Sequence, residues 1–156
     1  MDAIQYRNEV VANRRKHGFD AVDEYTNDFD PVWVTREVDD SIGEVTAFAT
    51  LVEEPEIDAV DVSAVADEFR TVLVEQVEDR HGATTPVGYV TFVVANPDPS
   101  LVEDARSYTV ARRRTNVFPL VFDCEAETLH RHEIPRLKGR GIYRRQAEDA
   151  ARLFEV

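Results

Sequence analysis

The segment VGYVTFVVAN, residues 87–96, restricts the possible folds of this chain more than any other. Successive side chains of a β-strand point to opposite faces of a sheet, and apolar residues occupy both odd and even positions here. Both faces of such a strand are apolar, which is typical of a strand inside a covered sheet. The segment therefore predicts a central strand.

The segments on either side predict helices and further strands around this central strand. Helical patterns span residues 3–18, 63–82, 96–114 and 142–156, and β-rich runs span residues 31–38, 44–53, 117–123 and 127–133. Their order, αββαβαββα, predicts one domain, residues 1–156, of the α+β or α/β class. It combines a mixed sheet of about five strands with about four helices on one or both faces.

The formal net charge of −13 on 156 residues is unevenly distributed along the chain. Residues 1–100 have a net charge of −15 and residues 101–156 a net charge of +2, and 16 of the 18 basic residues are arginine. This acidic, lysine-poor composition resembles proteins of extremely salt-loving archaea. In such proteins surface carboxylates maintain solubility while concentrated salt screens their repulsion. We therefore expect a halophilic protein whose acidity serves solvation.

The sequence favours a soluble, cytoplasmic protein without a cofactor or membrane contact. No apolar run approaches the roughly 18 residues that cross a bilayer. The first residues, MDAIQYRNEVV, lack the charged-then-apolar order of a signal peptide. Cys124 is the only cysteine, which excludes an internal disulfide and predicts a small buried side chain.

Two of the three basic clusters have a simple structural explanation. Arg14–Lys16 and Arg112–Arg114 fall in the predicted last turns of the first and third helices. A helix C-terminus has partial negative charge, which favours cations there. Nucleic-acid binding by Arg112, Arg113 and Arg114 stays open as an alternative.

The third cluster, RLKGRGIYRR at residues 136–145, leads into a predicted helix start. Cations are unfavourable at that end unless an anion offsets them, and a glycine-containing loop before a helix exposes free N–H groups. The candidate anion-binding residues are Arg136, Lys138, Gly139, Arg140, Gly141, Arg144 and Arg145. The competing interpretation is that these arginines pair with carboxylates of the protein itself.

A metal site has only weak support in the sequence. His130 and His132 would face the same side of a strand, and Cys124 lies six residues before His130. These three residues are candidate zinc ligands, but the paired cysteine and histidine spacings of structural zinc sites are missing. We therefore expect no metal.

No catalytic motif is present, and no catalytic residue is assigned. The chain lacks the G-x-x-x-x-G-K-[ST], G-x-G-x-x-G and G-x-S-x-G patterns. Asp39 and Asp40 precede Glu44-Val45-Thr46, but a threonine stands where a metal-dependent nuclease needs lysine. Turn and surface roles explain these carboxylates more simply.

These observations favour a non-catalytic binding or accessory module with an anion-binding basic C-terminal region, whose partner is a protein or a nucleic acid. One alternative is a nucleic-acid-binding protein, such as a nuclease accessory, that uses Arg112–Arg114 and the arginines of residues 136–145. Another is an enzyme acting on a phosphorylated small molecule at the glycine loop. Merged basic clusters would favour the nucleic-acid alternative, and internally paired arginines a protein-interaction module.

Overall fold

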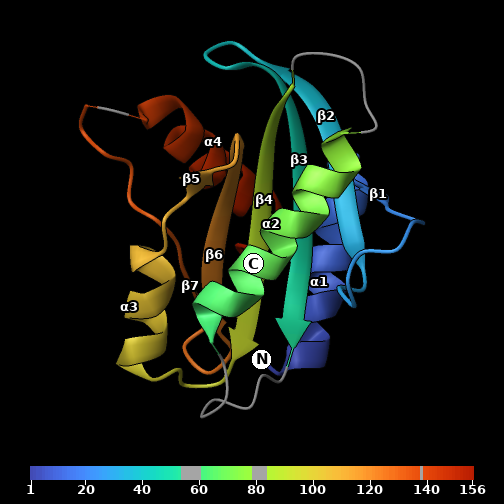
Figure 1. Ribbon diagram of the computed structural model, residues 1–156. Helices are drawn as coiled ribbons and strands as arrows, with labels where there is room; N and C mark the ends of the chain where they lie inside the picture. Colours follow the sequence, from blue (N-terminus) through green and yellow to red (C-terminus); the bar gives the residue numbers. More distant parts are fainter. Residues whose placement is uncertain (54–60, 79–83, 138) are drawn as a thin grey trace.

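The chain forms one mixed sheet covered by helices on both faces in the computed structural model, which describes residues 1–53, 61–78, 84–137 and 139–156 (Figure 1). The helices are α1 (Ala3–Lys16), α2 (Val62–Glu78), α3 (Pro99–Ser107) and α4 (Arg140–Leu153), and the strands are β1 (Asp20–Ala21), β2 (Val32–Asp39), β3 (Gly43–Glu53), β4 (Thr85–Val94), β5 (Ala111–Arg112), β6 (Thr115–Asp123) and β7 (Thr128–His130). The strand order is β1-β2-β3-β4-β6-β5, and β7 also pairs with β6. Within the described ranges, no helix is long and apolar enough to cross a membrane.

The predicted fold class and element order are confirmed, and the sheet is larger than predicted. It has seven strands because the two-residue strands β1 and β5 are added to the expected set. Strands this short have no periodic signal in the sequence, since two residues cannot establish an alternation.

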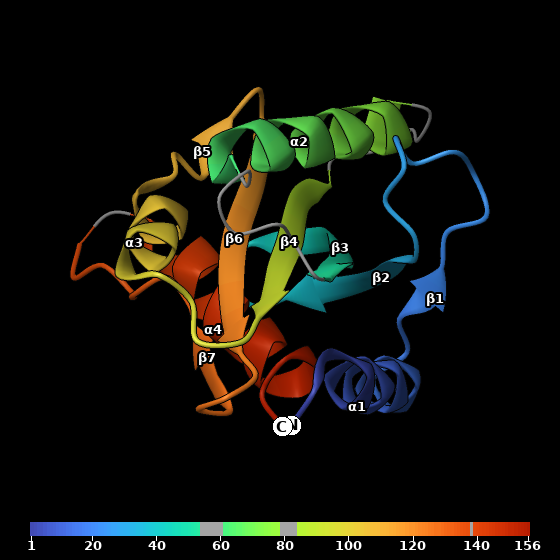
Figure 2. The ribbon, with the colours of Figure 1, turned by 90° about the horizontal axis from the view of Figure 1, so that it is seen from below.

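The segment that predicts a central strand forms β4, which lies between β3 and β6 and pairs in parallel with both. Val90 and Phe92 join the hydrophobic cluster that includes α2 and α3, whereas Tyr89 and Val93 join the cluster that includes α1 and α4. The crossovers β3–α2–β4 and β4–α3–β6 proceed in one direction across the sheet, which places α2 and α3 on the same face. Figure 2 shows α1 and α4 on the opposite face. The central-strand prediction is confirmed.

Helix α2 lies very close to β4 because Gly88 has no side chain. A Cβ atom at Gly88 would lie 2.9 Å from both methyl carbons of Leu73 and 3.0 Å from Phe69. The glycine thus positions α2, which carries one of the residues of the candidate site below.

The third helix is shorter than the sequence pattern predicts. It begins as expected at Pro99, and the Asp98 side chain accepts a hydrogen bond from the Ser100 N–H, but it ends at Ser107. The chain then turns into the β5–β6 hairpin, so the prediction that Arg112–Arg114 occupy a helix C-terminus is wrong. The reason is tertiary, because a buried side chain from α2 binds the backbone that follows Ser107.

The first basic cluster has the structural role that its position predicts. Arg14, Arg15 and Lys16 lie in the last turn of α1. Arg14 Nη1 donates to the Phe19 carbonyl, 3.1 Å away, just beyond the helix end. This cluster is therefore explained by stabilisation of the α1 C-terminus.

Candidate functional site

The hairpin between β5 and β6 presents three consecutive arginines. Arg112 pairs with Thr115, so Arg113 and Arg114 form a two-residue connection. Their φ angles are both positive, 52° and 59°, the pattern of a type I′ turn. All three arginines are exposed. We call Arg112–Arg114 the arginine turn.

The conformation of the arginine turn is unfavourable for the residues that occupy it. The left-handed region costs an L residue roughly 1–2 kcal/mol, and type I′ turns prefer Asn-Gly for that reason. Arg113 and Arg114 both lie in this region. Disfavoured backbone conformations are concentrated at functional sites, so this exposed turn is a candidate for one.

A buried arginine beneath the turn holds its backbone in place. Arg70 of α2 is only 2 % exposed. Its Nη1 donates to the carbonyls of Arg112 and Thr115, at 3.0 and 2.9 Å. Its Nη2 donates to the carbonyls of Thr109 and Val110, at 3.0 and 2.7 Å. One side chain thus binds the backbone on both sides of the turn.

Asp67 and Tyr108 orient the first arginine of the turn. Arg112 Nη2 donates to Asp67 Oδ1 at 2.7 Å, and the Tyr108 hydroxyl donates to the same oxygen at 2.6 Å. The Arg112 guanidinium also lies over the Tyr108 ring, 5.4 Å from its centroid. Burial raises the pKa of Tyr108, and the hydrogen bond to Asp67 raises it further, which keeps the hydroxyl protonated as a donor.

Arg113 and Arg114 differ from Arg112 in their surroundings. Neither side chain forms an ion pair or a hydrogen bond with any residue that the structure describes. Their guanidinium groups are therefore accessible to an external ligand, whereas Arg112 already has a carboxylate partner.

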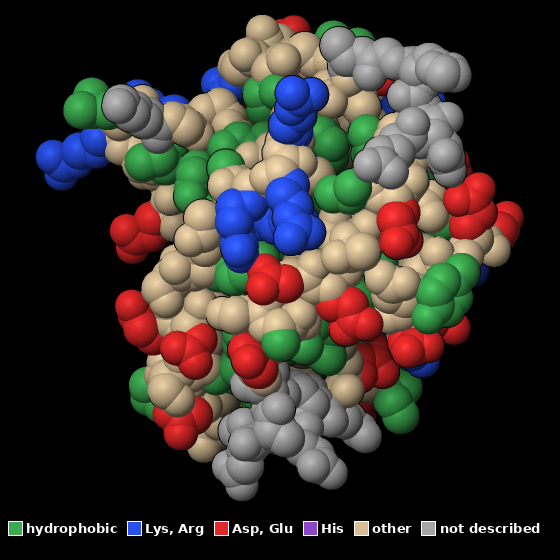
Figure 3. Space-filling model, viewed as in Figure 1, with side chains coloured by type: hydrophobic (Ala, Val, Ile, Leu, Met, Phe, Trp, Pro, Cys, Tyr) green, Lys and Arg blue, Asp and Glu red, His purple; other side chains and the backbone are tan. Residues whose placement is uncertain are grey.

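The arginine turn borders a hollow on the α2 face of the molecule. The hollow has a volume of about 260 Å³ and is lined by Asp67, Glu68, Arg70, Thr71, Arg112 and Arg113. Figure 3 shows most Lys and Arg side chains of this face in its upper half, several of them over β5 and α2, and most Asp and Glu side chains below them. On this face, positive charge is therefore concentrated at the end that carries the arginine turn.

The predicted anion-binding segment leads into α4, as expected. The helix begins at Arg140, with Gly139 as its N-cap at a φ of 75°, and no side chain caps its first turn. Arg136 and Arg140 are exposed, and neither has an ion pair among the described residues. Lys138 lies outside the described residues.

A second hollow adjoins the start of α4. It has a volume of about 310 Å³ and is lined by Ser41, Ile134, Arg140, Gly141 and Arg144. Arg144 donates to Ser41 Oγ and lies 3.9 Å from Glu148 and 4.0 Å from Asp39. Arg144 thus divides its contacts between the β2–β3 turn and its own helix.

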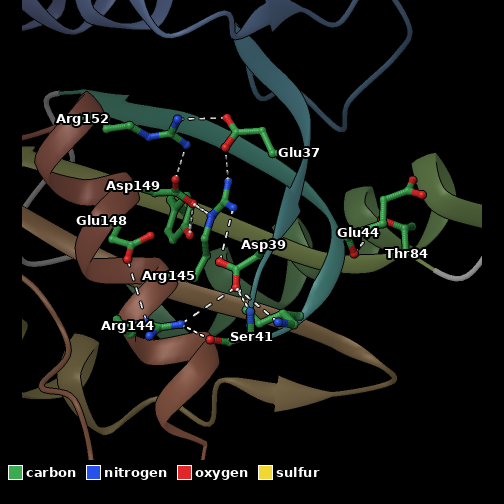
Figure 4. A network of polar contacts seen from close by, with 12 residues as sticks. Glu37, Asp39, Ser41, Glu44, Thr84, Arg144, Arg145, Glu148, Asp149 and Arg152 are labelled. Carbon is green, nitrogen blue, oxygen red and sulfur yellow. Dashed lines mark hydrogen bonds and ion pairs between the residues drawn. The ribbon is translucent and has the colours of Figure 1, made fainter.

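Arg145 forms ion pairs with three carboxylates of the protein, as Figure 4 shows. Its side chain is 4 % exposed and lies 3.0 Å from Glu37, 3.6 Å from Asp39 and 2.9 Å from Asp149. Arg152 contacts Glu37 and Asp149 from the next turns of α4. Arg145 therefore attaches α4 to β2 and has no free face for a ligand.

The same network controls the protonation of its carboxylates. Burial alone would raise the pKa of Glu37, but hydrogen bonds and charges from Arg152 and Arg145 outweigh burial and lower it. Burial would also raise the pKa of Asp39. The N–H groups of Ser41 and Ile42 and the charge of Arg145 outweigh burial and lower it.

We expect the free energy of unfolding to decrease as the pH falls from about 5 to about 3. Glu37 and Asp39 have lower pKa values in the folded chain. The stabilisation that these two carboxylates provide is complete above their pKa values in the unfolded chain, about 4. It is lost as the pH falls through their lower pKa values in the folded chain. Urea unfolding at a series of pH values and constant salt would measure this slope. A Glu37→Gln/Asp39→Asn variant should show a shallower slope, and an unchanged slope would contradict the assignment.

The candidate zinc ligands do not form a site. Strand β7 ends at His130, so His132 lies beyond the strand. His132 is buried, its backbone N–H donates to Gln146 Oε1 at 2.8 Å, and its Nε2 lies 3.1 Å from the Pro119 carbonyl. Cys124 is also buried. Across the described ranges, no three His, Cys, Asp or Glu side chains could hold a metal ion.

Sequence reasoning missed Arg70, the residue that positions the arginine turn. A signal was present, because Arg70 lies three residues before Leu73 and four after Ala66, on the buried face of α2. An arginine on such a face needs buried acceptors.

Comparison with protein-family models, with curated proteins and with solved structures finds no match to this chain.

Proposed function

We propose that this protein is a non-catalytic binding module that binds a polyanionic partner through the arginine turn. One observation carries the proposal: Arg113 and Arg114 are exposed in a backbone conformation that disfavours them, above a buried arginine that holds the turn. A purely solvated surface needs neither feature. An exposed pair of guanidinium groups offers bidentate donors to phosphate, sulfate or carboxylate groups.

Arg136 and Arg140 form a second group of exposed arginines without an ion pair among the described residues. Figure 1 shows the start of α4 and the β5–β6 turn at the same end of the sheet, and Figure 2 shows β5 on the α2 side of the sheet and α4 on the other side. A partner with several anionic groups could contact both sides of this end. The proposed surface therefore contains Arg113, Arg114, Arg136 and Arg140, and it omits the internally paired Arg145.

An extended polyanion suits this surface better than a small anion. Asp67 and Glu68 line the hollow beside the turn, so an ion inside it would face two carboxylates. An extended ligand can bind the exposed guanidinium groups and stay outside the hollow. This argument favours a macromolecular partner over a phosphorylated metabolite.

Replacing Arg113 and Arg114 with Asn and Gly should affect the stability of the fold and the affinity for a polyanion in opposite directions. We expect Arg113→Asn/Arg114→Gly to raise the free energy of unfolding by about 1–2 kcal/mol, because these residues suit a type I′ turn. The same variant should lose at least about tenfold in affinity for a labelled heparin, used as a general polyanion. Urea unfolding and fluorescence anisotropy would measure the two effects.

The matched control is Arg15→Gln/Lys16→Gln, which removes the same charge from exposed positions at the end of α1. Its affinity for heparin should match that of the wild type. Equal losses in both variants would mean that net charge alone governs binding. A wild-type protein that binds no polyanion would refute the proposed function.

A further inference from the structure

We infer that the polyanion is double-stranded DNA, contacted at its phosphate backbone by the arginine turn and the start of α4. This inference rests on the proposed function and specifies its ligand. Three properties of the surface lead to it: the burial of nearby aromatic rings, the rigidity of the turn and the charge of the remaining molecule.

The aromatic rings near the arginines are not available for base stacking. Proteins that bind single strands usually stack bases on exposed aromatic side chains. Tyr108 is 7 % exposed, and the guanidinium groups of Arg70 and Arg112 lie over its ring at 5.5 and 5.4 Å. Tyr143, near the start of α4, is partly covered and packs edge-on against Phe118. The surface therefore offers guanidinium groups without a stacking platform.

The arginine turn is short and held in one conformation. Its two-residue connection is the tip of a two-stranded hairpin, and Arg70 binds the Arg112 carbonyl before it and the Thr115 carbonyl after it. A prearranged surface loses little conformational freedom when it binds a rigid target with regularly spaced charges. A DNA duplex is such a target, with one negative charge per about 1.7 Å of axis.

The hairpin is suited to phosphates rather than to base edges. A two-stranded ribbon fits the major groove, but β5 has only two residues and offers little length for insertion. Contacts to phosphates position a protein without reading sequence. We therefore expect little dependence of affinity on DNA sequence.

The acidic remainder of the chain gives the complex an unusual dependence on salt. Residues 1–100 have a net charge of −15 and repel DNA at long range. Salt screens this repulsion, since the Debye length falls from about 10 Å at 0.1 M to about 3 Å at 1 M. Added salt also weakens binding, because fewer counterions are released from the DNA when the protein binds. This effect lowers the logarithm of the binding constant by about 0.9 for each phosphate contact when the salt concentration rises tenfold.

The two effects predict a shallow salt dependence. Four contacts, from Arg113, Arg114, Arg136 and Arg140, would alone weaken binding on the order of 10³-fold or more between 0.1 and 1 M salt. Because screening of the acidic surface offsets part of this loss, we expect a decrease clearly smaller than about 10³-fold over the same range.

The experiment measures anisotropy of labelled DNA with the full chain between about 0.1 and 1 M KCl. The probes are two unrelated duplexes of about 20 base pairs, each single strand of these duplexes, and heparin. We expect duplex affinity to exceed single-strand affinity at least about tenfold. The two duplexes should agree within about twofold, and Arg113→Asn/Arg114→Gly should lower both affinities at least about tenfold. Arg15→Gln/Lys16→Gln should leave both unchanged.

The possible outcomes distinguish the inference from the function on which it rests. Single strands that bind as tightly as duplexes, or heparin binding without DNA binding, would overturn the duplex inference and leave the polyanion-binding function intact. A loss on the order of 10³-fold between 0.1 and 1 M KCl would overturn the screening argument. Binding of none of the probes would refute both proposals.

Discussion

Replacing Arg70 with methionine is expected to lower the free energy of unfolding by about 3–5 kcal/mol. The variant would remove the charged donor of four carbonyls, those of Val110 and Thr115 in buried hydrogen bonds and those of Thr109 and Arg112 in partly buried ones. Each charge-assisted bond contributes about 1.5–3 kcal/mol, but bonds to one side chain are not additive. Methionine preserves much of the volume of arginine, so the effect reports lost hydrogen bonds. Urea unfolding would measure it.

Arg112→Met is the matched control for this prediction. Arg112 forms an exposed ion pair with Asp67, and such pairs contribute about 1 kcal/mol or less. Arg70→Lys should have an intermediate effect, because lysine retains the charge but has three donors instead of the five of arginine. Equal stability of Arg70→Met and Arg112→Met would disprove the role of Arg70 as the residue that holds the turn.

Replacing Asp149 with alanine is expected to lower the free energy of unfolding by a similar amount, about 3–5 kcal/mol. Asp149 is fully buried and accepts hydrogen bonds from Tyr89 Oη at 2.6 Å and from Arg145 Nε at 2.9 Å. The variant would leave the Tyr89 hydroxyl unpaired and remove one of the carboxylates that offset the buried charge of Arg145. Removing one partner of a buried ion pair lowers the stability strongly, because the remaining charge stays buried without a partner.

The neighbouring Glu148→Ala is the control, since Glu148 is exposed and lies 3.9 Å from Arg144. We expect a change of about 0.5 kcal/mol or less for this variant, as for other exposed helix pairs. Urea is the suitable denaturant for both variants because guanidinium chloride would screen the ion pairs. Similar effects of the two substitutions would contradict a structural role for the buried network.

Local patterns were sufficient to predict most of the elements of the sheet and its helices. The apolar segment that forms β4 and the Asp98-Pro99 start of α3 depend on neighbouring residues alone, so their signals are readable in the chain. The end of α3 was not predictable in the same way. It depends on Arg70, which lies 37 residues before Ser107 in the sequence and contacts the backbone only in the folded chain.

The candidate site was predicted in part. Arg136 and Arg140 are exposed, and the sequence placed both before a helix. The helix begins two residues earlier than predicted, so Arg136 precedes it and Arg140 is its first residue. Arg113 and Arg114 form the connection of a hairpin, which contradicts their predicted place in a helix, and the nucleic-acid alternative that the sequence left open for them stays a prediction. Sequence position alone did not distinguish these arginines from Arg145.

The sequence by itself determined the charges, the central strand and the enrichment of arginine in the last third of the chain. Only the tertiary structure decided which arginines are paired. Arg140 and Arg145 both lie on α4, yet Arg140 is exposed and Arg145 is buried among three carboxylates. A helix turns about 100° per residue, so side chains five positions apart point about 140° away from each other. One side chain therefore faces the solvent, and the other faces the sheet.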